Sequence, residues 1–123
     1  MPTEHDVRAM MLALPEAQEV VVANWGDQPT FRVRNKMFGL VGHGAPTVCL
    51  KATVETQAAL LQEDPEVFLM APFFGRYGWI DVVLDRVDAE ELAELVEEAW
   101  RLTAPKRVVA AFDAETSSGG LRN

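Results

Sequence analysis

The sequence predicts an α+β domain in which helices pack on one face of a single antiparallel β-sheet of about five strands, in the order α-β-β-β-β-α-β-α. Apolar residues at helical spacing near both ends of the chain predict the helices, and alternating or β-branched stretches predict the strands between them. The connections between most successive strands are too short for parallel crossovers, so an antiparallel sheet is expected.

The length of 123 residues fits one domain with one core. We place this domain at residues 1–113. Residues 114–123 include Ser-Ser-Gly-Gly and are expected to form a disordered tail.

The first helix is expected to run from about Glu4 to Leu14 and to stop at Pro15. Thr3 followed by Asp6 resembles a capping box, in which a side chain and a backbone amide satisfy each other at a helix start. Four apolar residues then recur at helical spacing, namely Val7, Met10, Met11 and Leu14.

The predicted strands occupy about residues 19–23, 30–34, 36–41, 47–51 and 79–84. In the second of these, Phe31 and Val33 share one face, while Arg32 and Arg34 share the opposite face with Thr30. Glycine, proline and asparagine predict turns at 25–29, 35 and 42–46.

A second helix is expected between the fourth and fifth strands. Thr53 is positioned to cap its first turn, and Asp64-Pro65 ends it. The segment 66–78 is rich in aromatic residues, proline and glycine, and is expected to be irregular.

Asp88 is positioned to cap the last helix, and Glu91 completes a second capping box. Pro105 is expected to break or kink this helix, after which residues 106–112 add a turn or two. Its apolar stripe consists of Leu92, Leu95, Val96 and Ala99.

The composition excludes several classes of protein. Hydrophobic residues make up 49% of the chain, so it is not a disordered sequence, and a single cysteine cannot form an intrachain disulfide. The net charge of −8 argues against strong non-specific binding to nucleic acid, because phosphate contacts supply most of that affinity. It leaves room for a local basic site.

The sequence contains no recognisable catalytic or cofactor-binding motif. The only serines, Ser117 and Ser118, lie in the expected tail, so a serine hydrolase lacks its nucleophile. Cys49 sits in an apolar stretch typical of a buried, unreactive thiol. We expect no enzyme activity, no cofactor and no metal. Asp81, within a strand, is the one candidate for a perturbed pKa.

The charges are distributed unevenly. Residues 24–51 carry four basic side chains against one acid, whereas residues 85–98 carry seven acids against one arginine. A basic, aromatic sheet face is therefore expected to bind nucleic acid or another anionic ligand. The candidate ligand-binding residues are Arg32, Arg34, Lys36, Lys51, Arg76, Tyr77 and Trp79.

Two other interpretations of the same surface remain open. Asp81 is positioned to pair with Arg32 and Arg34 across the sheet, with Trp79 covering their aliphatic stems. Alternatively, an exposed aromatic patch forms a protein-interaction surface, as aromatic-rich interfaces do. The patch would contain Phe73, Phe74, Tyr77 and Trp79. The oligomeric state is not determined by the sequence.

The cytoplasm is the expected location, with no membrane association. The N-terminus is polar and acidic, unlike a basic secretory leader. The longest apolar run, 67–74, contains Pro72 and is far shorter than the roughly 20 residues of a membrane helix.

The order of several short strings resembles the MmcQ/YjbR family of small bacterial proteins, over about residues 4–112. The strings are Leu14-Pro15-Glu16-Ala17, Trp25-Gly26, Pro29 to Val33, Lys36-Met37-Phe38, Leu50-Lys51 and Gly78-Trp79. The resemblance implies a frataxin-like (CyaY-like) fold, with two helices layered on an antiparallel sheet. It also implies DNA binding through a proposed double-wing arrangement, with no residue-level contact motif. In frataxin-like folds an acidic helix edge is associated with iron, so acid-rich metal binding at the last helix is a further, less favoured alternative. Glutamates opposite an apolar stripe are normally the solvated face of a helix, and this is the preferred interpretation.

Overall fold

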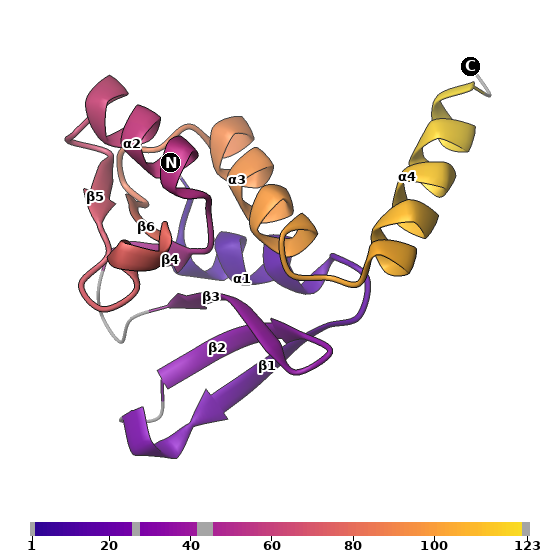
Figure 1. The fold of residues 1–123 in the computed structure, drawn as a ribbon, viewed down its shortest axis with the longest axis horizontal. Helices are drawn as coiled ribbons and strands as arrows, with labels where there is room; N and C mark the ends of the chain where they lie inside the picture. Colours follow the sequence, from indigo (N-terminus) through magenta and orange to yellow (C-terminus); the bar gives the residue numbers. More distant parts are fainter. Residues whose placement is uncertain (1, 26–27, 42–45, 122–123) are drawn as a thin grey trace.

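The computed structural model describes residues 2–25, 28–41 and 46–121 of the chain. Its elements follow one another along the chain in the order drawn in Figure 1. They are α1 (Glu4–Leu12), β1 (Ala17–Val22), η1 (Ala23–Trp25), β2 (Gln28–Val33), β3 (Lys36–Val41), β4 (Thr47–Leu50), α2 (Val54–Glu63), β5 (Phe68–Met70), η2 (Gly75–Tyr77), β6 (Ile80–Val83), α3 (Ala89–Arg101) and α4 (Lys106–Leu121).

The strands form one antiparallel sheet in the order β1-β2-β3-β4-β6-β5. Strands β1 to β4 follow each other as a meander, because their connections are short. Strand β6 then pairs with β4, and β5 pairs with the outer side of β6. The edges of the sheet are therefore β1 and β5.

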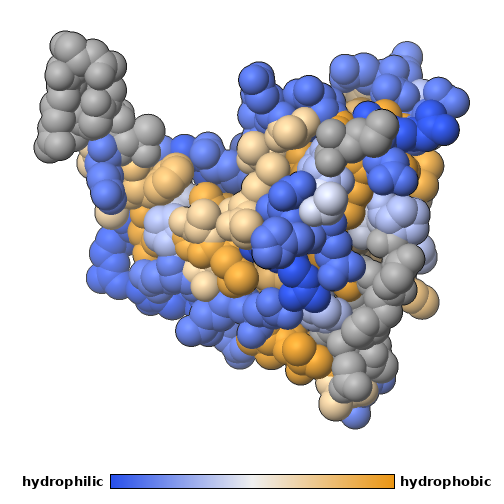
Figure 2. Space-filling view, turned by 180° about the vertical axis from the view of Figure 1, so that it is seen from behind, coloured by the Kyte–Doolittle hydropathy of each residue, from blue (hydrophilic) through white to orange (hydrophobic). Residues whose placement is uncertain are grey.

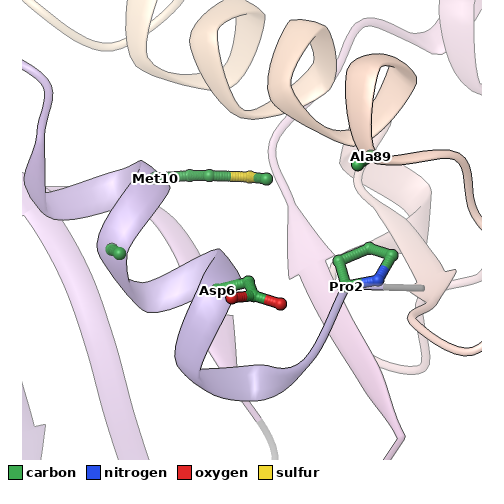
Figure 3. A pocket seen from close by; sticks show the side chains of 5 residues that line it. Pro2, Asp6, Met10 and Ala89 are labelled. Atoms are coloured by element: carbon green, nitrogen blue, oxygen red, sulfur yellow. The ribbon is translucent and has the colours of Figure 1, made fainter.

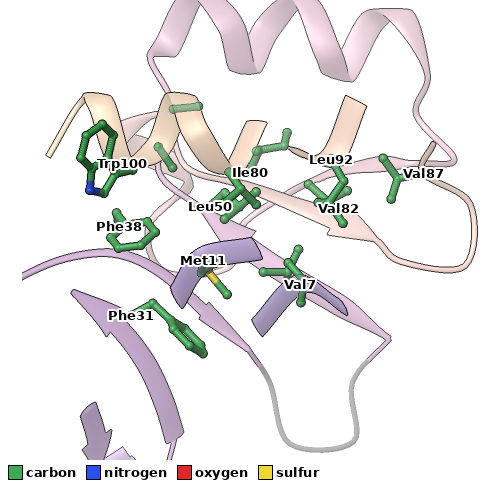
Figure 4. Close-up of a cluster of buried hydrophobic side chains, with 14 of the residues drawn as sticks. Val7, Met11, Phe31, Phe38, Leu50, Ile80, Val82, Val87, Leu92 and Trp100 are labelled. Atoms are coloured by element: carbon green, nitrogen blue, oxygen red, sulfur yellow. The ribbon is translucent and has the colours of Figure 1, made fainter. Parts of the chain in front are cut away.

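Helices α1 and α3 pack against each other and against one face of this sheet. The core between these layers is apolar, as Figure 4 shows. Helix α1 contributes Val7 and Met11, and α3 contributes Leu92 and Trp100. The strands contribute Phe31, Val33, Phe38, Val41, Val48, Leu50, Phe68, Ile80 and Val82.

The helix starts form where the sequence places them. Thr3 and Asp6 form the reciprocal capping box of α1, and Thr53 accepts a hydrogen bond from the Thr56 amide at the start of α2. Asp88 accepts hydrogen bonds from the amides of Glu90 and Glu91. Among the described residues, the Glu91 carboxylate accepts no hydrogen bond from the Asp88 amide. Asp88 therefore caps α3 without the reciprocal bond of the expected capping box.

The predicted α+β class is confirmed, and two segments differ from expectation. The aromatic-rich segment 66–78 contains a short edge strand, β5, so the sheet has six strands. Helix α4 runs from Lys106 to Leu121 and is therefore longer than the turn or two expected after Pro105; its first turns are supported by Val108, Val109 and Phe112, which pack on the core. Expected turn positions 26–27 and 42–45, and the last two residues, lie outside the described residues.

Helix α4 is held against the end of α3 by contacts between side chains. Arg101 donates bidentate hydrogen bonds to Asp113, at 3.0 and 2.5 Å. The ring of Phe112 meets the ring of Trp100 edge-on, with 5.1 Å between centroids. In Figure 1 the far end of α4 points away from the sheet.

Candidate functional site

The candidate surface lies on the face of the sheet opposite α1 and α3. Residues that are directly paired across neighbouring strands project to the same face of a sheet, so the strand pairs identify which side chains lie on it. One row across this face runs from β5 to β2. It consists of Leu69, Asp81, Cys49, Leu40 and Thr30.

A small second hydrophobic cluster covers part of this face. Cys49, Ala71 and Trp79 form its buried centre, and Met37, Leu40 and Phe74 pack against it. The rings of Trp79 and Phe74 lie 5.0 Å apart. Trp79 is only 7% exposed, so the expectation of an open tryptophan beside the arginines is wrong. The segment 71–79 packs against the strands and encloses the ring.

Gln57 anchors this segment, which we call the aromatic loop (residues 71–79). Its amide Nε2 donates hydrogen bonds to the carbonyls of Gly75 and Trp79, each at 2.7 Å. The side chain is buried, so both bonds form out of water, where an unpaired carbonyl is costly. Nothing in the sequence around Gln57 indicates this role, because a glutamine on a helix ordinarily faces solvent.

Asp81 lies beside Cys49 in the middle of the covered row. Burial raises the pKa of the half-buried Asp81 carboxyl, and a hydrogen bond from the Cys49 thiol partly opposes this. Burial, followed by the charge of Asp81, raises the pKa of Cys49 far above its ordinary value. The thiol is therefore neutral and buried, as the sequence predicts, and is a poor nucleophile.

The predicted pairing of Asp81 with arginines is wrong. Strands β3 and β4 separate Asp81 from Arg32 on β2. Arg32 instead donates from Nε to Thr30 Oγ1 at 3.1 Å, and Arg34 forms a bidentate ion pair with Glu16. The prediction failed because the alternation of side chains along a strand shows only which face of the sheet a residue is on. The order of the strands in the sheet decides which residues are its neighbours.

The structure separates the seven candidate residues into three groups. Lys36 is paired with Val33 and so lies on the helix-covered side, where Arg34 occupies the adjoining turn. Lys51 continues β4 beyond Leu50, its amide bonded to Phe38 at 3.0 Å, and alternation places it on the face of Cys49. Arg32, Lys51 and Trp79 thus share one face, and Arg76 and Tyr77 lie on the aromatic loop.

The remaining cations of this face lack acidic partners in the part of the chain that is described. The ion pairs there involve Arg8, Arg34 and Arg101, and none involves Arg32, Lys51 or Arg76. The guanidinium of Arg76 lies 4.9 Å from the centre of the Tyr77 ring, which is 60% exposed.

The aromatic loop also presents apolar side chains to solvent. Phe73 is 83% exposed, and Leu69 and Met70 on the adjacent edge strand are exposed as well. Phe74, expected in the same exposed patch, is half-buried against Trp79. The exposed patch is therefore formed by Leu69, Met70, Phe73 and Tyr77.

The helical side carries different features. A hollow of about 530 Å³ between α1 and the start of α3 is lined by Pro2, Asp6, Ala9, Met10 and Ala89 (Figure 3). Asp6 already accepts the Thr3 amide in the capping box, so this hollow offers little polar chemistry. Seen from behind, the molecule exposes apolar residues left of the centre and again near the lower edge, with hydrophilic residues between and around them (Figure 2).

The acidic end of α3 shows no arrangement of metal ligands. Burial, followed by the nearby carboxylates of Glu63 and Asp88, raises the pKa of Glu91. Among the residues described, no three or more His, Cys, Asp or Glu side chains gather closely enough to hold a metal ion. In the same part of the chain, every helix is too short or too polar to span a lipid bilayer.

Comparisons with known proteins place this fold in a family. The model of the YjbR family matches residues 12–102. Uncharacterised proteins of Mycobacterium bovis and Mycobacterium tuberculosis, Mb2600 and Rv2570, are each 38% identical to the chain over 58 residues. These matches cover 47% of this chain and 45% of either relative, so about half the length of each curated relative is matched. The crystal structure of Deinococcus radiodurans protein DR2400, with a DUF419 domain, superposes with a TM-score of 0.74 at 26% identity, over 83% of this chain and 78% of that one.

Proposed function

For this chain, which belongs to the YjbR family, we propose a role as a binding module that takes up single-stranded nucleic acid on the sheet face opposite α1 and α3. One observation carries the proposal. Arg32 and Lys51 lie on that face, and Arg76 lies on the adjoining aromatic loop; among the described residues none of the three forms an ion pair. The same loop exposes the rings of Phe73 and Tyr77.

The chemistry of these side chains suits a nucleic-acid strand. Arg32, Lys51 and Arg76 supply positive charge for phosphates, and an arginine binds phosphate oxygens through two parallel hydrogen bonds. The exposed rings of Tyr77 and Phe73 supply surfaces on which unpaired bases stack. A single strand is favoured over a duplex, because duplex bases are already stacked on each other.

The cation count sets the expected salt dependence. Three phosphate contacts predict a slope of about −2 for log K against log salt, from about −0.7 per contact on single strands. The net charge of −8 repels a polyanion, so binding is expected to be weak at physiological salt. We propose binding rather than catalysis; Cys49, the single thiol of the chain, is buried beside Asp81 and is not presented to a ligand on this face.

Arg32→Ala combined with Lys51→Ala is expected to remove most of the affinity for a single-stranded oligonucleotide and to reduce the salt slope by about 1.4, because two of three phosphate contacts are lost. Fluorescence anisotropy with short labelled oligonucleotides, single-stranded and duplex, measures both quantities. The matched control is Arg86→Ala with Lys106→Ala, which changes the net charge equally at the far end of β6 and on α4.

Three results would contradict the nucleic-acid proposal. They are no binding of the single strand at low salt, equal loss of affinity in both double variants, and a preference for duplex.

We also propose self-association through β5 and the aromatic loop as a second candidate. The outer side of β5 is a sheet edge, and Leu69, Met70 and Phe73 expose apolar surface beside it. Phe73→Glu is expected to abolish a rise of mass with protein concentration, measured by light scattering, because it places a charge in the contact. The matched control is Leu12→Glu, which places the same charge at an exposed site at the end of α1, away from β5 and the aromatic loop. A mass that stays monomeric at all concentrations contradicts this candidate.

A further inference from the structure

The aromatic loop rests on a single buried amide side chain. Gln57 on α2 is 5% exposed, and its Nε2 donates to the backbone carbonyls of Gly75 and Trp79 at 2.7 Å each. The same nitrogen lies 3.3 Å from Sδ of Met70. A glutamine amide carries two donor hydrogens, so the two carbonyls account for both of them. One side chain of α2 thus connects the end of β5, the aromatic loop and the start of β6.

The two carbonyls held by this amide lie on either side of Arg76 and Tyr77. The backbone between them forms the short turn η2, in which the Tyr77 amide donates to the Phe74 carbonyl at 2.9 Å. The Gly75 carbonyl, one of the two held by the amide, also accepts the Gly78 amide at 3.0 Å. Holding both ends of so short a turn fixes the direction in which its two side chains project.

Arg76 and Tyr77 form a unit within this turn. The guanidinium of Arg76 lies over the Tyr77 ring, 4.9 Å from its centre, and the ring is 60% exposed. A cation over an aromatic ring is attracted to it, so the two side chains support each other's position. A base stacked on this ring and a phosphate paired with this guanidinium would both depend on how the turn is oriented.

The end of the loop also lies directly against the helix that carries Gln57. A Cβ at Gly78 would lie 2.8 Å from the Ala52 carbonyl oxygen and 2.9 Å from backbone atoms at the start of α2. Helix α2 in turn packs beside β5, as Figure 1 shows. The helix therefore supports the loop at two points, of which the Gln57 amide is the one made by a side chain.

We propose that Gln57 is a positioning residue for the nucleic-acid site. It sets the orientation of η2 and thereby aligns Arg76 and Tyr77 with a bound single strand, while it contacts neither base nor phosphate itself. The inference rests on the function proposed above. It differs from a purely structural role, because a structural glutamine would stabilise the fold without acting through those two side chains.

Gln57→Met keeps the length of the side chain and removes both donor hydrogens. The affinity for a single-stranded oligonucleotide is expected to fall about tenfold, as loss of one stacked base does. The salt slope is expected to shrink by about 0.7, because Arg76 supplies one of the three phosphate contacts. Fluorescence anisotropy measures both quantities. The matched control is Gln62→Met, the same change at an exposed site on α2, which should alter neither.

A combined variant separates positioning from general stabilisation. In a chain that already carries Arg76→Ala and Tyr77→Ala, Gln57→Met is expected to cause no further loss of affinity, because the side chains through which it acts are absent. A loss that adds in full to that of the double variant would show a structural role and overturn the proposal.

Hydrogen exchange tests the hydrogen bonds without nucleic acid. In Gln57→Met the amides of residues 75–79 are expected to exchange faster, while those of α1 and α3 stay protected. In the unaltered protein, the side-chain amide hydrogens of Gln57 are expected to exchange far more slowly than those of Gln62, a comparison that does not depend on how well a variant folds.

The outcomes distinguish this inference from the function on which it rests. Equal side-chain exchange at Gln57 and Gln62, unchanged loop exchange in Gln57→Met, or unchanged affinity in that variant would each overturn the positioning role alone, provided that the unaltered protein binds the oligonucleotide. Absence of binding by the unaltered protein would overturn the proposed function and this inference together.

Discussion

Trp100→Ala is expected to lower the free energy of unfolding by about 3–5 kcal/mol, the usual cost of truncating a large buried aromatic side chain. Trp100 is fully buried where α3, α4 and the end of α1 meet. Its Nε1 donates to the Pro15 carbonyl at 3.0 Å, and its ring supports Phe112 at 5.1 Å. The substitution therefore opens a cavity and removes the partner of a carbonyl oxygen.

Urea unfolding followed by circular dichroism measures this change. Trp100→Phe keeps a six-membered aromatic ring but loses the rest of the indole together with its hydrogen bond, so its cost is expected to lie below that of Trp100→Ala. A loss below about 1 kcal/mol for Trp100→Ala would show that this junction contributes little to stability.

Gly78→Ala is expected to destabilise the protein by more than about 2 kcal/mol, because a backbone conformation and a backbone clash act together. Gly78 has a φ of 97°, which L side chains rarely adopt. A Cβ there would lie 2.8 Å from the Ala52 carbonyl oxygen and 2.9 Å from backbone atoms of Thr53 and Val54. These atoms begin α2, so they have little freedom to move aside.

Gly75→Ala is the matched comparison within the same loop. Its Cβ would lie 2.6 Å from Sδ of Met70, at the flexible end of a side chain that is 55% exposed. Met70 can turn away into solvent, so the expected loss is less than about 1 kcal/mol. Thermal unfolding of both variants measures the difference. Equal losses for the two glycines would contradict the idea that backbone contacts at Gly78 fix the aromatic loop.

The sequence determined the features that depend on neighbours along the chain. Caps at Thr3, Thr53 and Asp88, the strand from Lys36 to Val41 and the break at Pro105 all follow from residues within a few positions of each other. The resemblance to the YjbR family, based on short strings, is confirmed by the match over residues 12–102. The buried position of Cys49 also follows from its local apolar run.

The tertiary structure decided which of these residues meet. Asp81 meets Cys49 rather than an arginine, because β6 pairs with β4 while β2 lies two strands further along the sheet. Trp79 is buried because Gln57 on α2, 22 residues earlier in the chain, donates hydrogen bonds to two backbone carbonyls of the aromatic loop and so keeps the loop against the sheet. Arg34 turns to Glu16 because the chain reverses at a left-handed turn. Local patterns depend on backbone propensity over a few residues, whereas strand order and loop anchoring depend on contacts between distant segments, and those contacts form only when the chain has folded.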